Sequence, residues 1–182
     1  MTTGILILPL QQMTEQELIA GCRSGRREAF DELVARHYDR IYRLAYALAG
    51  SERDQDLAQE TFLSALRSFP TFRGESQVAT WLISILRNQV SNFRRTERKW
   101  RMAPLEGEED RLSAPPPREI EAGVRAILER MKELPDDLRW TLILFYIEGM
   151  RYAEIAQAMG CPIGTVRSRL FEARERLKAC VR

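Results

Sequence analysis

Apolar residues recur every three to four positions along most of the chain, which is the spacing of one face of an α-helix. This pattern begins at Thr14, where "TEQE" matches a capping box, and continues in several segments to about residue 100. Turn residues interrupt it at "RSGRRE", "LAGSERDQ" and "FPTFRGES". We find no convincing alternation of apolar and polar residues, the pattern of a β-strand. The sequence therefore predicts an all-α fold.

A segment of different composition divides the chain. Residues 102–121 are rich in proline and carry two basic and six acidic residues, a local net charge of −4. Such a composition is typical of a flexible linker. We predict a flexible extension at 1–13, a helical domain at 14–101, this acidic linker at 102–121, and a second helical domain at 122–182. A protein that starts at Met13 fits the first residues equally well.

The second domain contains two short helical segments around a tight turn. Gly160 ends the first segment, and "GCPIG" leads into a helix at 164–178. One side of that helix is apolar: Val166, Leu170, Ala173 and Leu177. The opposite arc carries hydroxyl, charged and aromatic groups: Thr165, Arg167, Ser168, Phe171, Glu172 and Glu175. This spacing is typical of a helix-turn-helix whose arginine and ring meet base edges in the major groove. A structural hairpin with a solvated basic face is the alternative.

The segment at 77–98 has a second polar face. Its apolar side consists of Val78, Trp81, Leu82, Ile85, Leu86, Val90 and Phe93. We expect Trp81 to lie in the core with this set. Its other side is basic and rich in small polar groups: Thr80, Ser84, Arg87, Asn88, Ser91, Arg94 and Arg95. Residues 87–101 have a local net charge of +5, although the whole chain carries only +2. Such a face can follow phosphates and touch exposed bases, or it can simply be solvated.

The segment at 54–69 combines a predicted core stripe with apolar residues outside it. The stripe consists of Ala58, Phe62, Ala65, Leu66 and Phe69. Leu57 and Leu63 lie outside the stripe, beside acidic and amide side chains: Asp56, Gln59 and Glu60. Exposed leucines next to acids indicate a surface that docks on another protein. Burial of the helix on two sides is the alternative.

Little in the chain favours catalysis or metal binding. It has one histidine, His37, and three scattered cysteines, Cys22, Cys161 and Cys180. No paired metal motif and no glycine loop for phosphate is visible. We predict no catalytic residues, no metal and no cofactor, so no enzyme. No apolar run approaches the length that spans a membrane, and we expect a protein of the reducing cytoplasm.

Two long stretches resemble the extracytoplasmic-function group of bacterial RNA polymerase sigma factors. "DQDLAQETFLSALRSFPTFRGES" with "TWLISILRN" is similar to region 2 of that family. "LPDDLRWTLILFYIEGMRYAEIAQAMGCPIGTVRSRLFEARERL" is similar to region 4. The resemblance implies a subunit that binds core RNA polymerase and directs it to promoter DNA, often in a stress response and under control of an anti-sigma factor.

The resemblance also implies residue roles. The helix that docks on the polymerase clamp, formed by the largest subunits, would use Asp56, Gln59, Glu60, Leu63 and Arg67. Capture of the melted −10 strand would use Arg73, Gly74, Glu75, Ser76, Thr80, Arg87, Asn88, Ser91, Arg94 and Arg95. Reading of the −35 duplex would use Arg151, Tyr152, Thr165, Arg167, Ser168, Phe171, Glu172 and Arg174.

Two positions in region 4 depart from the family. Glu172 stands where relatives often have arginine, and a glutamate there can accept from cytosine N4. Arg151 stands where many relatives have a serine N-cap, so Glu154 keeps only its half of the capping box. The rival functions are a stand-alone helix-turn-helix regulator, which needs no polymerase, an enzyme, and an adaptor that binds only protein.

Overall fold

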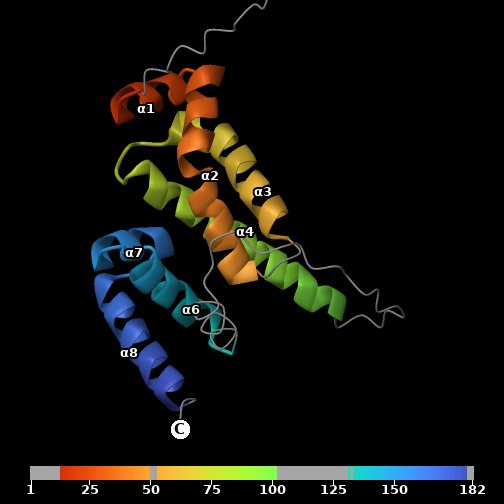
Figure 1. The fold of residues 1–182 in the computed structure, drawn as a ribbon, viewed down its shortest axis with the longest axis vertical. Helices are drawn as coiled ribbons and strands as arrows, with labels where there is room; N and C mark the ends of the chain where they lie inside the picture. The colour runs from red at the N-terminus through yellow and green to blue at the C-terminus, as the bar shows by residue number, and fades with distance from the viewer. Residues whose placement is uncertain (1–12, 50–52, 102–130, 132, 180–182) are drawn as a thin grey trace, which may run out of the picture.

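The computed structural model describes residues 13–49, 53–101, 131 and 133–179, and every regular element in these ranges is a helix (Figure 1). This confirms the all-α prediction. The elements are, in chain order, α1 (Glu15–Arg23), α2 (Arg27–Ala49), α3 (Asp54–Ser68), the short 3-10 turn η1 (Phe69–Thr71), α4 (Val78–Arg101), α6 (Asp136–Leu142), the π-helical turn η2 (Ile143–Ile147), α7 (Tyr152–Met159) and α8 (Ile163–Ala179). The predicted extension, except for Met13, and the predicted linker lie outside the described residues.

The first unit, α1 to α4, begins with the capping box expected at Thr14. The Thr14 hydroxyl accepts from the backbone N–H of Glu17 at 3.3 Å, and the Glu17 carboxylate accepts from the backbone N–H of Thr14 at 2.8 Å. This second bond holds the pKa of Glu17 below its usual value. α1 then passes very close to α2, because a Cβ added to Gly21 would lie 2.6 Å from that of Ala29.

The buried face of α3 differs from the predicted stripe at several positions. Leu57 is buried at 6% exposure, although we expected it outside the stripe. Leu66 is 47% exposed, so its assignment to the core was wrong. The observed stripe also contains Thr61, whose hydroxyl donates to the carbonyl of Leu57 at 2.7 Å. A threonine can therefore take a core position, since its polar group is satisfied by its own helix.

Helix α4 is buried on more than its predicted apolar side. Val78, Leu82, Leu86 and Val90 are buried as expected, but so are Ile83 and Thr80. α4 contacts α3 and α2 on one side and α7 of the second unit on another, which accounts for the wider burial (Figure 1). Trp81 packs beside this core, with its ring 5.1 Å from that of Phe69 and 4.8 Å from that of Phe72.

The second unit consists of α6, η2, α7 and α8. Pro135 precedes α6, and the helix continues through the π-helical turn before α7 begins. Gly160 ends α7 in the left-handed conformation, with φ of 59°, which glycine adopts without the steric cost that a Cβ brings. α8 then packs its predicted stripe against α6 and α7, and Val166, Leu170 and Ala173 are almost fully buried.

Candidate nucleic-acid interface

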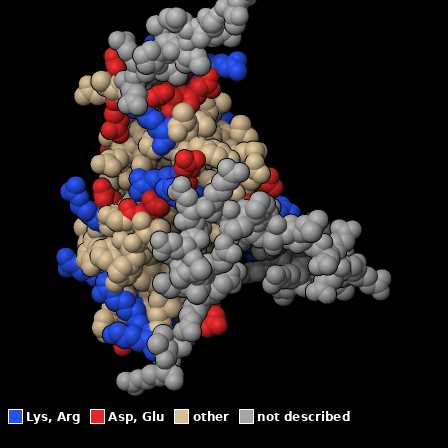
Figure 2. Space-filling model, in the orientation of Figure 1, with Lys and Arg blue, Asp and Glu red and all other residues tan. Residues whose placement is uncertain are grey.

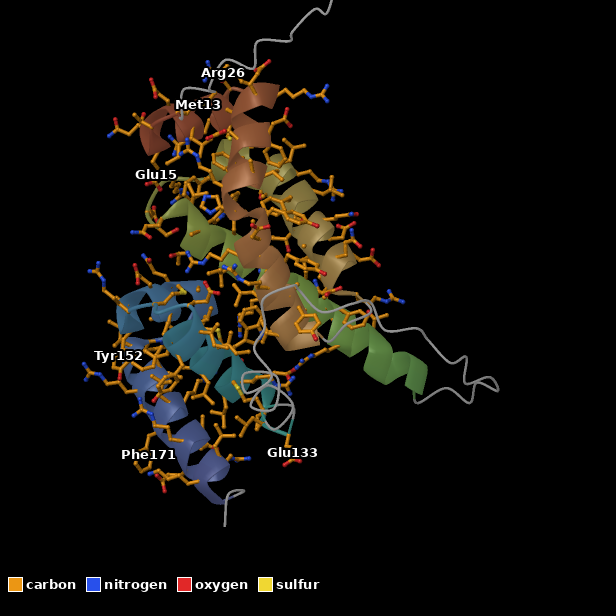
Figure 3. All side chains as sticks on the ribbon, in the orientation of Figure 1. Met13, Glu15, Arg26, Glu133, Tyr152 and Phe171 are labelled. Atoms are coloured by element: carbon orange, nitrogen blue, oxygen red, sulfur yellow. The ribbon has the colours of Figure 1, made fainter. Side chains whose placement is uncertain are left out.

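The outer arc of α8 carries the residues expected to read duplex DNA. Phe171 is 67% exposed, and Arg167 and Ser168 are exposed on the same arc. Figure 3 labels Phe171 at the outer edge of the second unit, and Figure 2 shows basic side chains following that edge. Thr165, by contrast, is half-buried. A large exposed ring opposite a buried stripe gains no stability from the fold, which favours contact with another molecule.

Side chains next to the outer arc of α8 are held by hydrogen bonds and ion pairs. The Glu154 carboxylate accepts from the backbone N–H of Arg151 at 2.7 Å, the remaining half of a capping box. Arg174 donates to the hydroxyl of Tyr146 at 2.8 Å and lies over its ring at 5.5 Å from the centroid. Glu172 pairs with Arg176 at 2.7 Å on the exposed surface. The guanidinium of Arg176 therefore partly neutralises the Glu172 carboxylate.

Residues 73–76, which we expect to capture the −10 strand and therefore call the −10 loop, lie between η1 and α4 in the first unit. Arg73, Gly74 and Glu75 are exposed, and Gly74 has a left-handed φ of 77°. Arg73 and Glu75 approach only to 3.8 Å, with both side chains mostly exposed. The aromatic rings of Phe69, Phe72 and Trp81, which flank this loop in sequence, pack against one another. The loop is therefore a mostly exposed run of polar groups that connects two parts of one aromatic cluster.

The polar face of α4 is divided between exposed and paired residues. Asn88, Ser91 and Arg95 are exposed. Arg87 and Arg94 instead form ion pairs with the start of α6: Arg87 lies 3.3 Å from Asp137, and Arg94 contacts Asp136. Figure 2 shows basic and acidic side chains adjoining where the two units meet. Two arginines expected to follow DNA phosphates are thus neutralised by carboxylates of the same chain.

Further contacts join the two units. Arg40 of α2 pairs with Glu148 at 2.5 Å, and the amide of Gln157 in α7 donates to the carbonyl of Glu75 in the −10 loop at 3.2 Å. Asp137 also pairs with Arg169 of α8, so one carboxylate lies between two arginines. We call the three pairs Arg87–Asp137, Arg94–Asp136 and Arg40–Glu148 the closure contact. Thr80 of α4, also expected to contact the strand, is buried.

The sequence did not reveal the closure contact. The acids at 136 and 137 lie in the first turn of α6, where a favourable interaction with the helix dipole is the ordinary reason for acids. The sequence contains a run of positive charge on α4 and two adjacent acids about 40 residues later. Neither feature indicates which of these residues form ion pairs.

The candidate docking residues form one exposed stripe on α3. Asp56, Gln59, Glu60, Leu63 and Arg67 are all exposed, and Leu63 is 45% exposed. These positions recur every three to four residues and therefore share a helix face. The exposed Leu66 adds apolar surface beside them. An apolar centre with a charged rim is typical of an interface with another protein.

The rest of the described chain offers no other chemistry of this kind. Among the described residues there is no cluster of side chains that could hold a metal ion. No helix in those ranges is long and apolar enough to cross a membrane. Burial raises the pKa of the Cys22 thiol to about 11, which keeps it protonated and unreactive. Cys161, in the turn before α8, lies 3.7 Å from a guanidinium nitrogen of Arg169.

Comparisons with known proteins cover both units. Family models match sigma-70 region 2 at residues 33–100 and sigma-70 region 4 at residues 124–177. The chain is 33% identical to the ECF RNA polymerase sigma-E factor of Haemophilus influenzae, over 92% of this chain and 95% of that protein. It is 34% identical to the factor of the same name from Escherichia coli K12, over 91% and 93%.

Two solved structures are similar in fold. One is CnrH in complex with the cytosolic domain of CnrY, with a TM-score of 0.70 and 24% identity over 92% of this chain and 96% of that one. The other is the sigma factor RpoE of Bartonella quintana in complex with the anti-sigma factor NepR. Its TM-score is 0.68, with 25% identity over 84% of this chain and 96% of that one.

Proposed function

The chain belongs to the extracytoplasmic-function (ECF) group of RNA polymerase sigma factors and is an alternative sigma factor that directs transcription, and from this premise we propose how its two units divide promoter recognition. The second unit reads the −35 element as duplex, and the first unit captures the −10 element as an opened strand. The observation that carries this division is the contrast between their surfaces. α8 presents a convex arc with an exposed ring, whereas the first unit presents a polar loop beside a basic helix.

The N-terminal half of α8 reads the −35 duplex. Arg167 has the reach and fork geometry to bond a guanine edge, and the ring of Phe171 suits a thymine methyl group. Ser168 lies between them, with its hydroxyl donating to carbonyls of its own helix at 3.1–3.3 Å. Thr165, Arg151, Tyr152 and Arg174 flank this centre and meet the backbone. Glu172, held by Arg176, favours cytosine over guanine at its position.

Strand capture falls to the −10 loop and the polar face of α4. An unstacked base costs a few kcal/mol to expose, so its reader must gain that energy by binding the opened state alone. Residues 73–76 receive the base, while Asn88, Ser91 and Arg95 follow the strand. Arg87, Arg94 and Thr80 join them once the closure contact has separated. Promoter binding therefore requires the two units to move apart.

The exposed stripe of α3 docks on the clamp of core polymerase. Leu63 supplies the apolar centre of this contact, with Asp56, Gln59, Glu60 and Arg67 around it. Its position on α3 leaves the −10 loop and α8 accessible for DNA. The chain supplies recognition only, and the polymerase does the chemistry, so we assign no catalytic residue, metal or cofactor. Because core polymerase and promoter DNA are its partners, we place it in the cytoplasm.

An inhibitory protein partner follows from the same surfaces. One similar structure is that of a sigma factor bound to an anti-sigma factor. In this chain, exposed leucines of α3 and exposed large apolar residues of η2 and α8 give such a partner apolar surface to cover: Leu63, Leu66, Tyr146, Ile147 and Phe171. Purification from unstressed cells should yield an additional protein that dissociates when transcription is induced. Recovery of polymerase subunits alone would contradict this.

Run-off transcription with purified core polymerase on a randomised promoter library tests the proposal. We expect transcription that requires both chain and core, with two conserved elements among the selected promoters. A stand-alone helix-turn-helix regulator would instead bind duplex DNA without polymerase and select one element. Arg167→Ala should weaken selection at one −35 position, which a protein adaptor without DNA contacts would not do.

A further inference from the structure

Arg23, the last residue of α1, reaches across the first unit to the start of the −10 loop. Its Nε donates to the backbone carbonyl of Phe72 at 2.9 Å, and its Nη2 donates to the same oxygen. The two residues are 49 positions apart in sequence, and α1 contacts η1 as a whole. A side chain that binds a backbone carbonyl so distant in sequence restrains the backbone at that carbonyl.

Phe72 is held at both ends by this arrangement. Its ring packs against those of Phe69 and Trp81, at 5.4 and 4.8 Å between centroids. Its backbone N–H donates to the carbonyl of Phe69 at 3.0 Å, which closes η1. The carbonyl, the point where the chain leaves η1 for the loop, is the group that Arg23 binds. The direction in which residue 73 departs is therefore set by the guanidinium.

The contact extends under the loop itself. A Cβ added to Gly74 would have the Nη2 of Arg23 as its neighbour, at 3.8 Å. The loop also accepts a hydrogen bond from Gln157, but that residue belongs to the second unit and leaves when the units separate. Arg23 lies in the first unit and remains. It is the restraint that can hold the loop while DNA is bound.

We propose that Arg23 is a positioning residue for −10 recognition, which rests on the proposed role of residues 73–76 in capturing a base. A loop already held in its binding conformation loses less conformational freedom when the base enters. It also distinguishes bases better, because a wrong base cannot be accommodated by a shift of the loop. A guanidinium suits this task, since it is always charged and presents several N–H groups in one plane.

The test compares holoenzymes that carry Arg23→Ala, Arg23→Lys or Arg27→Ala. Arg27 is the matched control, because it lies four residues away and its side chain is 90% exposed. Each holoenzyme transcribes a set of promoters with single changes in the −10 or −35 element. We expect Arg23→Ala to reduce discrimination among −10 bases about three- to tenfold, the scale of one ordinary net hydrogen bond. Discrimination at −35 and affinity for core should stay unchanged.

Partial recovery with Arg23→Lys, which keeps the charge and a donor, would support positioning. Equal loss of activity on every promoter, with −10 discrimination intact, would overturn the proposal and leave Arg23 a structural residue. Full discrimination in all three variants would overturn it as well. If Arg23→Ala proves unfolded by circular dichroism, Arg23→Lys decides alone. A wild-type holoenzyme without any −10 preference would refute the proposed function instead, so the two failures are distinguishable.

Discussion

Asp137→Asn should open the closure contact. Asp137 lies between Arg87 of the first unit and Arg169 of the second. Removing its charge abolishes one pair between the units and leaves two arginines facing each other. The side chains are 26% exposed for Arg87 and 44% exposed for Asp137, so solvent screens the pair. A pair of this kind contributes about 0.2–1 kcal/mol, and the new repulsion is of similar size.

The two effects add to about 0.4–2 kcal/mol, which shifts the ratio of open to closed molecules about two- to thirtyfold. Small-angle X-ray scattering at about 0.1 M salt, where the screening length is about 10 Å, should show a larger radius of gyration than the wild type. The wild type should approach the same value as salt is raised. Single-stranded −10 DNA should also bind the variant more tightly.

Glu175→Gln is the matched control. It makes the same change of net charge on α8, where Glu175 pairs with the exposed Lys178 at 2.8 Å. We expect it to scatter like the wild type. If Asp137→Asn and Glu175→Gln give the same radius and the same DNA affinity, the closure contact does not control access to the arginines, and this reasoning is wrong.

Three further predictions concern the other surfaces. Phe171→Ala should reduce discrimination at one −35 base pair by about 1–3 kcal/mol and should not lower the melting temperature of the protein. Equal weakening of binding to all promoter sequences would contradict a base contact. Leu63→Asp should lower affinity for core polymerase in a pull-down titration, whereas Arg27→Ala should not. Burial, and after it the charge of Arg40, lowers the pKa of His37 below its ordinary value of 6.5. As the pH falls, the unfolded chain therefore protonates His37 before the folded chain does. Urea titrations should therefore show the free energy of unfolding falling as pH drops from about 7 through that value, and His37→Gln should flatten this dependence.

Local periodicity made much of this structure predictable. The stripe of α8 and its exposed ring follow from spacing alone, because one short helix with one buried side leaves little ambiguity. α3 was harder, since Leu57 and Leu66 both lie at the margin of its apolar stripe. Only the packing of neighbouring helices decided that Leu57 is buried and Leu66 exposed.

The contacts that could not be predicted join residues far apart in sequence. The pairs Arg94–Asp136 and Arg40–Glu148 depend on how two units meet, which no local pattern encodes. The same holds for Arg23, whose partner is a backbone carbonyl and therefore has no signature in the amino-acid sequence. The burial of Thr80 likewise reflects a second packed side of α4 rather than its composition.

Strand capture by the first unit can be measured as binding of the holoenzyme to two promoters that differ only in whether the −10 element is already opened. We predict tighter binding to the opened promoter, and loss of that advantage when Arg87 and Arg95 are both changed to alanine. A change in the −35 duplex should weaken both complexes equally. Equal affinity for the opened and closed promoters, or full affinity of the chain for closed duplex without core polymerase, would contradict this prediction.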